Sequence, residues 1–378
     1  MPDVLLIGDT VRSPELRREV PVEIGDPFLY AEVDGRRVAI VWSIEGDRIT
    51  AVDPTVEIVA SETFPTTDFR RDDIDIYDVP ALQAVRMVRA LGITSALVPS
   101  GFPLGIADAL RGAGVELVTD QRYFDDRRRV KSPEQLAGIR VAQRAAEDGM
   151  AAIASALRHS EASAGGRVLH GEPLTCERLR VLATEAFSAR GCRGDDLIVA
   201  HGAQAADGHD PGSGQVANDD VVLCDLFPGH LASGYFADMT RTFRVGAADE
   251  TITLWHERCV EALELAVSLV RPGIDGREIH AAVSAFFEEL GHPTQLSVPA
   301  GSVLRDGFYH GLGHGVGLEV HEAPGLGRLG HPLVVGDVIA LEPGLYRYGW
   351  GGVRIEDLVL VTPDGCEVLT EYPYGLDP

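Results

Sequence analysis

The sequence predicts an α+β chain of two domains, on three observations. Its 378 residues suffice for two or three domains, because a domain averages roughly 150 residues. The first third alternates short apolar runs with helical segments, which is typical of a three-layer α/β unit. The remainder repeats a unit of two helices followed by strands, which indicates an internally duplicated α+β domain.

The amino-terminal domain is expected over residues 1–130. Strands are predicted over 38–42, 95–98 and 115–118, and helices over 81–91 and 104–112. Because parallel strands need long crossover connections, this alternation favours a mostly parallel sheet. No Gly-x-Gly-x-x-Gly motif follows these strands, so dinucleotide binding is not indicated. We expect this domain to shape or cover a site built elsewhere.

A charged run at 125–129 marks the boundary, and the second domain is expected over residues 131–378. The run is interpreted as a solvated linker, with an anion site as the alternative. Ser132 as N-cap, Pro133 at the first helical position and Gln135 three residues after the cap predict a helix start. Amphipathic helices are expected near 133–158, 175–190, 250–270 and 276–290.

Charge and cysteine usage exclude several classes of partner. The chain has 33 Lys and Arg against 58 Asp and Glu, a formal charge of −25, which repels phosphate backbones and anionic membranes. Nucleic acid and membrane partners are therefore not expected. The five cysteines form no Cys-x-x-Cys pair and no apolar run approaches a membrane span of roughly 18 residues. A cytoplasmic protein is expected.

Two acids lie in apolar strands near the middle of the chain. Asp225 lies in the run 221–227, and Asp238 lies in the returning run 235–243. An isolated buried carboxylate is costly, so such acids are paired or bind metal. Alternation along the strand places Thr240 on the face of Asp238, where we expect its hydroxyl to orient that carboxylate.

Further candidate ligands follow in the last third of the chain. Three histidines, His310, His314 and His321, lie in a glycine-rich segment, which favours ligand or proton-shuttle roles. Glu342 and Glu356 each lie in an apolar strand, and Arg354 is the expected ion-pair partner of Glu356. Four carboxylates and an imidazole suit pairs of Mn²⁺, Co²⁺ or Zn²⁺. A two-metal hydrolytic centre is therefore the leading hypothesis.

These motifs together resemble the pita-bread metallopeptidase family, in the branch of Xaa-Pro dipeptidases (prolidases) and aminopeptidase P. The resemblance spans the whole chain and implies a carboxy-terminal pita-bread (creatinase/aminopeptidase) fold after an amino-terminal creatinase-like domain. Its motifs are Cys224-Asp225-Leu226, Ala237-Asp238-Met239-Thr240-Arg241-Thr242, the run from His310 to Glu322, Leu341-Glu342-Pro343-Gly344 and Arg354-Ile355-Glu356-Asp357.

The resemblance implies two divalent ions per chain, with Mn²⁺ favoured over Co²⁺ or Zn²⁺. Asp225 would chelate one ion, Asp238 and Glu356 would bridge the two, and His314 and Glu342 would bind the second. The substrate-side residues implied are His209, His310, His321 and Arg354, with Glu342, His310 and His321 acting in catalysis. The resemblance also implies a homodimer or a tetramer.

Two departures from the family pattern lie beside the expected site. Asp225 and Asp238 are separated by 13 positions, two more than is usual in these families, which indicates a longer hairpin between them. His209 also lacks the proline that usually precedes it.

The predicted activity is hydrolysis of the bond between an N-terminal residue and proline in short proline-containing peptides. Glu342 is expected to relay a proton to the departing nitrogen, and Phe308 and Tyr309 to line the proline pocket. Alternatives are an Xaa-Pro aminopeptidase on longer peptides, a creatinase-like amidinohydrolase and a non-catalytic binding module.

Several other residues are not expected to take part in chemistry. Cys224 is expected to be a buried hydrophobe. His256, His280 and His292 are expected at the surface or as caps. Trp350 is either a packed loop aromatic or a residue facing the substrate channel.

Overall fold

The computed structural model describes residues 2–66, 74–247 and 249–378. The chain divides into two compact units, Met1–Arg128 and Arg129–Pro378. No helix in the described part of the chain is both long and apolar enough to cross a membrane.

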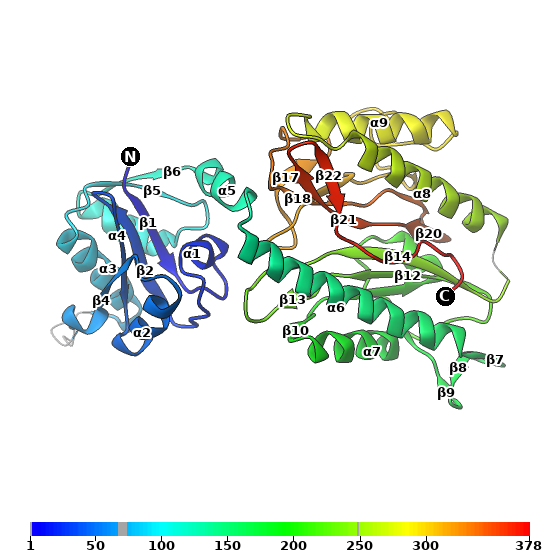
Figure 1. The fold of residues 1–378 in the computed structure, drawn as a ribbon, viewed down its shortest axis with the longest axis horizontal. Helices are drawn as coiled ribbons and strands as arrows, with labels where there is room; N and C mark the ends of the chain where they lie inside the picture. Colours follow the sequence, from blue (N-terminus) through cyan, green and yellow to red (C-terminus); the bar gives the residue numbers. More distant parts are fainter. Residues whose placement is uncertain (1, 67–73, 248) are drawn as a thin grey trace. The chain divides into compact units, whose positions relative to one another are not determined.

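The first unit is built on one mixed sheet of six strands in the order β4-β3-β2-β1-β5-β6 (Figure 1). Its strands are β1 (Val4–Gly8), β2 (Phe28–Val33), β3 (Arg36–Val41), β4 (Val56–Ala60), β5 (Ser95–Val98) and β6 (Glu116–Thr119). Three of the five pairings are parallel, β3 with β4, β1 with β5 and β5 with β6, and two are antiparallel. The three predicted strands correspond to β3, β5 and β6, whereas β1, β2 and β4 were not predicted.

Helices cover both faces of this sheet. They are α1 (Pro14–Glu19), α2 (Ser43–Val52), α3 (Val79–Ala90), α4 (Leu104–Gly112) and α5 (Gln121–Arg129), with short 3₁₀ turns η1 (Ser61–Thr63) and η3 (Ile76–Asp78). Val4 and Leu6 belong to one apolar cluster with Leu16 of α1, whereas Leu5 belongs to another with Val88 of α3. Successive residues of a strand point to opposite faces, so the unit has the three layers predicted.

The interpretation of the charged run 125–129 as a solvated linker is wrong. The run lies inside α5, and Arg128 and Arg129 are each only 6% exposed. Arg127 pairs with Glu19 at 2.9 Å and with Glu32 at 2.5 Å. The local run of charges predicts solvent exposure, but acidic partners distant in the sequence pair with Arg127.

Four helices of the second unit lie where the amphipathic pattern places them. They are α6 (Pro133–Arg158), α7 (Cys176–Ala189), α8 (Glu250–Leu269) and α9 (Gly276–Glu289). The Ser132 hydroxyl accepts from the backbone N–H of Gln135, and the Gln135 side chain accepts from the Ser132 N–H. This capping box satisfies two helix-terminal donors and confirms the predicted start of α6.

The strands of the second unit are short. They are β7 (Glu161–Ser163), β8 (Gly166–Leu169), β9 (Glu172–Pro173), β10 (Cys192–Arg193), β11 (Ile198–His201), β12 (Asp220–Leu226), β13 (Gly229–His230), β14 (Met239–Val245), β15 (Asp306–Gly307), β16 (Gly313–Gly315), β17 (Glu322–Leu326), β18 (Val338–Leu341), β19 (Gly344–Arg347), β20 (Gly351–Arg354), β21 (Asp357–Thr362) and β22 (Gly365–Val368), with a 3₁₀ turn η4 (Gly202–Ala206). The largest sheets run β17-β16-β18-β21-β22, β11-β12-β14 and β15-β19-β20.

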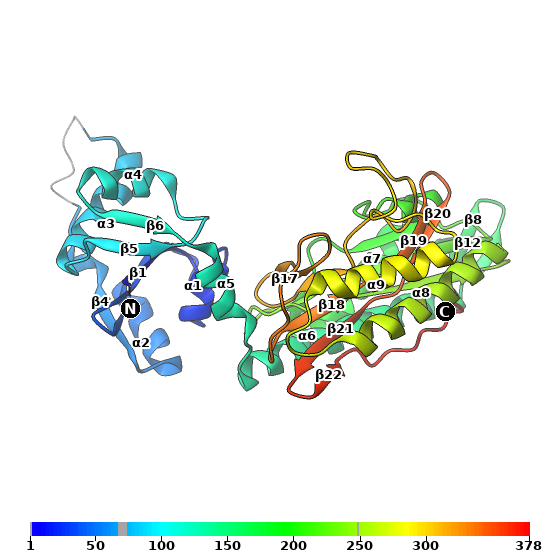
Figure 2. The same cartoon turned by 90° about the horizontal axis from the view of Figure 1, so that it is seen from above.

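The two helix pairs lie on opposite sides of these strands, and Figure 2 shows α8 and α9 side by side. One apolar cluster joins α6 and α7 to β11, β12 and β14, and a second joins α8 and α9 to β18, β19, β20 and β21. The helix-helix-strands unit therefore occurs twice, as predicted, with each copy burying its own core.

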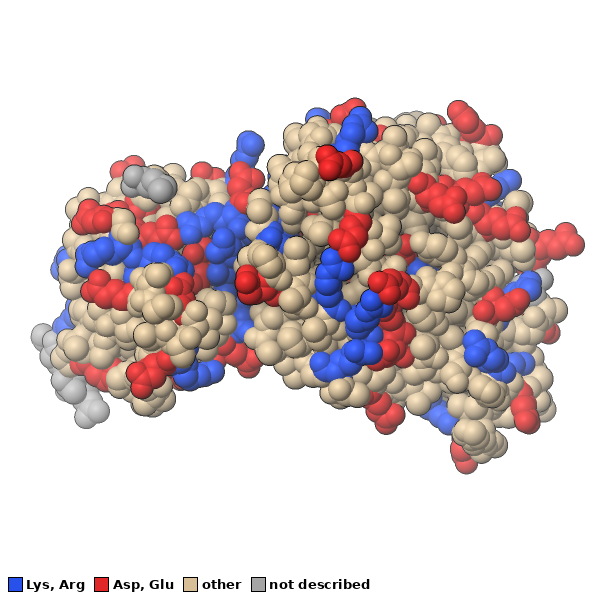
Figure 3. All heavy atoms as spheres, viewed as in Figure 1, with Lys and Arg blue, Asp and Glu red and all other residues tan. Residues whose placement is uncertain are grey.

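Acidic and basic side chains are interspersed over the face drawn in Figure 3. Exposed ion pairs of the second unit include Arg140 with Glu367 and Arg144 with Glu371. Such pairs contribute little to stability because both partners remain hydrated.

Candidate active site

The first two candidate ligands come from the β12–β14 hairpin. Asp225 is the sixth residue of β12, and Asp238 directly precedes β14. The register pairs Asp225 with Thr240 and Leu226 with Met239. The long connection between β12 and β14 contains the short strand β13, which pairs with β10. The strand pairing predicted from the sequence is confirmed, and both carboxylates are at least nine-tenths buried.

His314 and Glu342 lie on neighbouring strands of the five-stranded sheet. His314 is the middle residue of β16 and pairs with Ala340 of β18, and Glu342 follows the end of β18. A Cβ atom on Gly313 would lie 1.9 Å from the carbonyl oxygen of Ala340. Glycine at this position therefore allows β16 to approach β18 closely enough to bring His314 beside Glu342.

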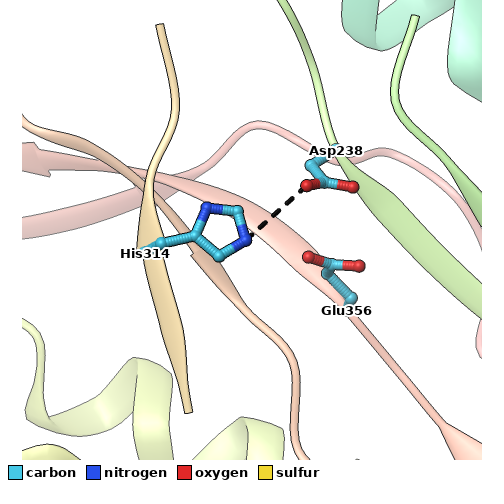
Figure 4. A group of neighbouring side chains, drawn as sticks. All are labelled: Asp238, His314 and Glu356. Carbon is cyan, nitrogen blue, oxygen red and sulfur yellow. Dashed lines mark ion pairs between the residues drawn. The ribbon is translucent and has the colours of Figure 1, made fainter. Parts of the chain in front are cut away.

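Asp238, His314 and Glu356 form a group able to hold a metal ion, with ligand atoms within 4.8 Å of one another (Figure 4). His314 Nε2 lies 3.7 Å from Asp238 Oδ2 and 3.7 Å from Glu342 Oε1. Oδ1 of Asp225 and Oδ1 of Asp238 are buried without a hydrogen-bond partner. Unpaired buried carboxylate oxygens are costly, so this donor set fits divalent cations.

Burial and close spacing shift the pKa values of the candidate ligands. Burial raises the pKa of Asp238 and of Glu356, and neighbouring carboxylates raise both further. Burial also raises the pKa of Glu342 to about 7 and lowers that of His314 to about 3. Bound cations would oppose the shifts of the carboxylates by favouring their charged forms, and they would reinforce the shift of His314 by favouring the neutral imidazole.

Two partners expected along single strands differ in the structure. The Thr240 hydroxyl donates to Glu356 Oε2 at 2.6 Å, not to Asp238. Arg354 pairs with Asp225 Oδ2 at 2.6 Å, and its Nε donates to Thr240, so Glu356 is not its hydrogen-bonded partner. Alternation identifies residues sharing a face of one strand, but these contacts cross between strands.

Tyr346 is a site residue that the sequence reasoning missed. Its hydroxyl accepts from Arg354 Nη1 at 3.2 Å and lies 2.8 Å from His310 Nε2. The other His310 nitrogen lies 2.7 Å from the Gly311 carbonyl oxygen, so Nδ1 donates there and Nε2 accepts from Tyr346. Alternate residues of a strand share one face, so Glu342, Gly344 and Tyr346 are expected on the same side. This pattern would have identified Tyr346 from the sequence.

One cavity of about 760 Å³ brings together all of the predicted site residues. Its wall includes Asp225, Asp238, His314, Glu342, Glu356, His209, His310, His321 and Arg354. His209 and His321 are exposed, whereas His310 and Arg354 are held by neighbours. Six of the nine side chains lie between His310 and Glu356 in the sequence, and the other three come from the first half of the unit.

The aromatic residues expected near the site differ in whether they reach the cavity. Tyr309 lines the cavity, but Phe308 is fully buried in the core beside Phe287. Trp350 packs edge-on against Trp255, as a packed loop aromatic does. Cys224 is fully buried, as expected.

Two histidines that we expected at the surface or as caps are instead buried. His256 is 8% exposed and His280 is 1% exposed. Both lie on the buried faces of the helices α8 and α9. Counting histidine with the apolar residues of each amphipathic helix would have predicted their burial.

The sequence profile of metallopeptidase family M24 matches residues 137–363. The chain belongs to this family. It is 30% identical over 334 residues to the Xaa-Pro dipeptidase of Pyrococcus horikoshii, covering 87% of this chain and 85% of that protein.

Solved structures of a prolidase and of an X-Pro aminopeptidase share the fold over nearly the whole chain. The prolidase from Pyrococcus horikoshii OT3 matches with a TM-score of 0.77 and 25% identity, covering 100% of this chain and 95% of that chain. The X-Pro aminopeptidase from Thermotoga maritima MSB8 matches with a TM-score of 0.77 and 22% identity, covering 99% and 97%. The predicted α+β pita-bread architecture is confirmed, and the chain is a metallopeptidase.

Proposed function

We propose that the protein is a dinuclear metal-dependent Xaa-Pro dipeptidase that acts on short proline-containing peptides. The observation that carries this proposal is the convergence of Asp238, His314 and Glu356 with two further acids in one cavity. The two buried, unpartnered carboxylate oxygens support cation binding there. The name of the Pyrococcus horikoshii relative supports the choice of substrate.

Asp225, Asp238, His314, Glu342 and Glu356 would hold two divalent ions, with Mn²⁺ preferred and Co²⁺ or Zn²⁺ as alternatives. When bound, such ions activate water and polarise the scissile carbonyl. Arg354 and Thr240 would orient two of these ligands through hydrogen bonds. Arg354 fixes Oδ2 of Asp225 and leaves Oδ1 free, while Thr240 fixes Oε2 of Glu356.

The remaining residues would orient the peptide and move protons. The carboxylate of Glu342 takes a proton from the attacking water and passes it to the departing proline nitrogen. His209 and His321, both exposed in the cavity, can donate to the developing oxyanion or to the product carboxylate. His310 is oriented by Tyr346 and by the Gly311 carbonyl.

A hydrolysis panel tests the substrate. Gly-Pro, Ala-Pro, Xaa-Pro-Xaa tripeptides and non-proline dipeptides are offered to apo-protein loaded separately with Mn²⁺, Co²⁺ and Zn²⁺. We expect rapid cleavage of the Xaa-Pro dipeptides alone. Preferential cleavage of the tripeptides would assign the aminopeptidase alternative, and cleavage of only the non-proline peptides would refute the proline specificity.

Substitution of a metal ligand separates the proposal from its rivals. Glu356→Gln should reduce bound metal, measured by elemental analysis, and lower peptidase activity roughly 100-fold or more. Asp364→Asn, an exposed acid in a turn of the same unit, is the matched control and should change neither. A creatinase-like amidinohydrolase would keep its activity in Glu356→Gln, and a binding module would contain no stoichiometric metal.

The assembly and location complete the proposal. We propose a cytoplasmic homodimer whose chains each comprise domains 1–130 and 131–378. Light scattering coupled to size-exclusion chromatography measures the mass directly, and a monomeric mass would refute the dimer.

A further inference from the structure

The chain contains a single lysine. Of its 33 cationic residues, only the one at position 131 is Lys, and the other 32 are Arg. The Lys131 side chain is 0% exposed and that of Glu322 is 1% exposed. Nζ of Lys131 lies 2.6 Å from Oε1 of Glu322. A buried ion pair is costly to desolvate, so we expect a structural role of this pair in the contacts of Glu322.

Glu322 lies on the strand next to the one that carries His314, opposite the irregular point of that pairing. It is the first residue of β17, directly after His321, and pairs with Gly315. The register between β16 and β17 shifts between His314 and Gly315. Such bulges redirect side chains next to active sites.

The carboxylate of Glu322 also closes the turn that links the two histidines. A Cβ atom on Gly317 would lie 2.3 Å from Glu322 Oε1, so this side chain packs directly against the turn. The rings of His314 and His321, at opposite ends of the turn, are 4.1 Å apart between centroids. The ion pair is therefore positioned to set the direction of both rings.

A second buried ion pair anchors the strand on the other side of β16. Arg129 donates to Asp337 through Nε at 2.8 Å and Nη2 at 2.6 Å, and the two side chains are 7% and 0% exposed. Asp337 directly precedes β18, which leads to Glu342. Since β16 lies between β17 and β18, residues 129–131 fix both of its neighbours.

We propose that Lys131 is a positioning residue, whose ion pair with Glu322 holds the bulge and turn that direct His314 and His321 into the cavity. Its catalytic consequence rests on the proposed peptidase function. The placement of the histidine rings can also be measured without any turnover.

Variants separate positioning from stability. Lys131→Met alone leaves Glu322 buried and unpaired, whereas Lys131→Met/Glu322→Leu removes both charges and should recover the melting temperature. We expect the double variant to retain a kcat/KM for Ala-Pro roughly 10- to 100-fold below wild type, because a small misplacement of reacting groups is costly. Arg140→Met, which removes an exposed ion pair with Glu367, is the control and should match wild type.

A folded double variant with wild-type kcat/KM would overturn the proposal. Lys131→Arg keeps the charge and should recover part of the activity lost in Lys131→Met. If the double variant does not fold, the comparison of Lys131→Arg with Lys131→Met decides. Equal kcat/KM in these two single variants would then overturn the proposal.

Two further measurements do not depend on activity. Labelling with ¹⁵N-lysine gives one side-chain ammonium resonance, which should shift in Glu322→Gln. Diethyl pyrocarbonate modification, followed by mass spectrometry, should change in rate at His321 in the double variant, with His209 in the same cavity as internal reference. Unchanged His321 reactivity would overturn the proposal, whereas failure of wild type to cleave Ala-Pro would refute only the proposed function.

Discussion

The two oxygens of one carboxylate at the site differ in their contacts. Asp225 offers Oδ2 to Arg354 and keeps Oδ1 buried without a partner. The acids themselves could be found from the sequence, because a carboxylate within an apolar strand is costly unless it is paired or bound to metal. Their partners could not, because the contacts of Thr240 and Arg354 cross to other strands.

The buried His280 leads to a pH prediction. Burial and, to a smaller extent, the nearby charge of Arg328 lower the pKa of His280 to about 4. Between this value and the unfolded pKa of about 6.5, the unfolded chain binds more protons. The free energy of unfolding should therefore fall as the pH drops from about 6.5 to about 4, by at most about 3 kcal/mol from this residue.

Urea unfolding across this pH range measures the effect. His280→Leu should flatten the pH dependence, whereas His159→Gln, at an exposed position on the end of α6, should not. Identical pH profiles for His280→Leu and wild type would contradict the assignment.

Helices and strands differed in how well the sequence predicted them. The four helices of the second unit were located to within about a residue because amphipathic periodicity and caps are local properties. The charged helix α5 was missed because partners distant in the sequence, Glu19 and Glu32, neutralise the charge of its Arg127. The strand β1 was missed because five apolar residues carry little pattern of their own.

Close packing of α6 on α7 gives a prediction for Gly149. A Cβ atom there would lie 2.5 Å from Cε1 of Phe187. Gly149→Ala should therefore lower the free energy of unfolding by roughly 1–3 kcal/mol, despite the better helix propensity of alanine. In a Phe187→Leu background the same substitution should cost much less, and equal costs in the two backgrounds, measured with urea, would rule out the steric explanation.

The site is assembled by the second unit as a whole. Asp225 and Asp238 come from the half containing α6 and α7, and His314, Glu342 and Glu356 come from the half containing α8 and α9. Burial and, after it, repulsion by neighbouring carboxylates raise the pKa values of Asp238 and Glu356. Cations bound between the halves would replace this repulsion with attraction and join the two cores.

Metal removal should therefore destabilise the molecule. An ion that binds only the folded state contributes about 2.7 kcal/mol at a concentration of 100 times its Kd. Chelation should lower the melting temperature of wild type, and added Mn²⁺ should restore it. Asp238→Asn should respond weakly to either treatment, and a melting temperature of wild type that is independent of metal would contradict the prediction.

The sequence by itself determined the α+β class and the duplicated helical units, and it identified the acids and histidines that the structure places around one cavity. These follow from periodicity, capping and the cost of burying a charge, which act over a few residues. Only the tertiary structure decided that Arg354 holds Asp225, that Tyr346 orients His310, and that Lys131 lies against Glu322. Such contacts depend on which strands lie side by side, because a hydrogen bond or buried ion pair is defined by distance in space and not by position along the chain.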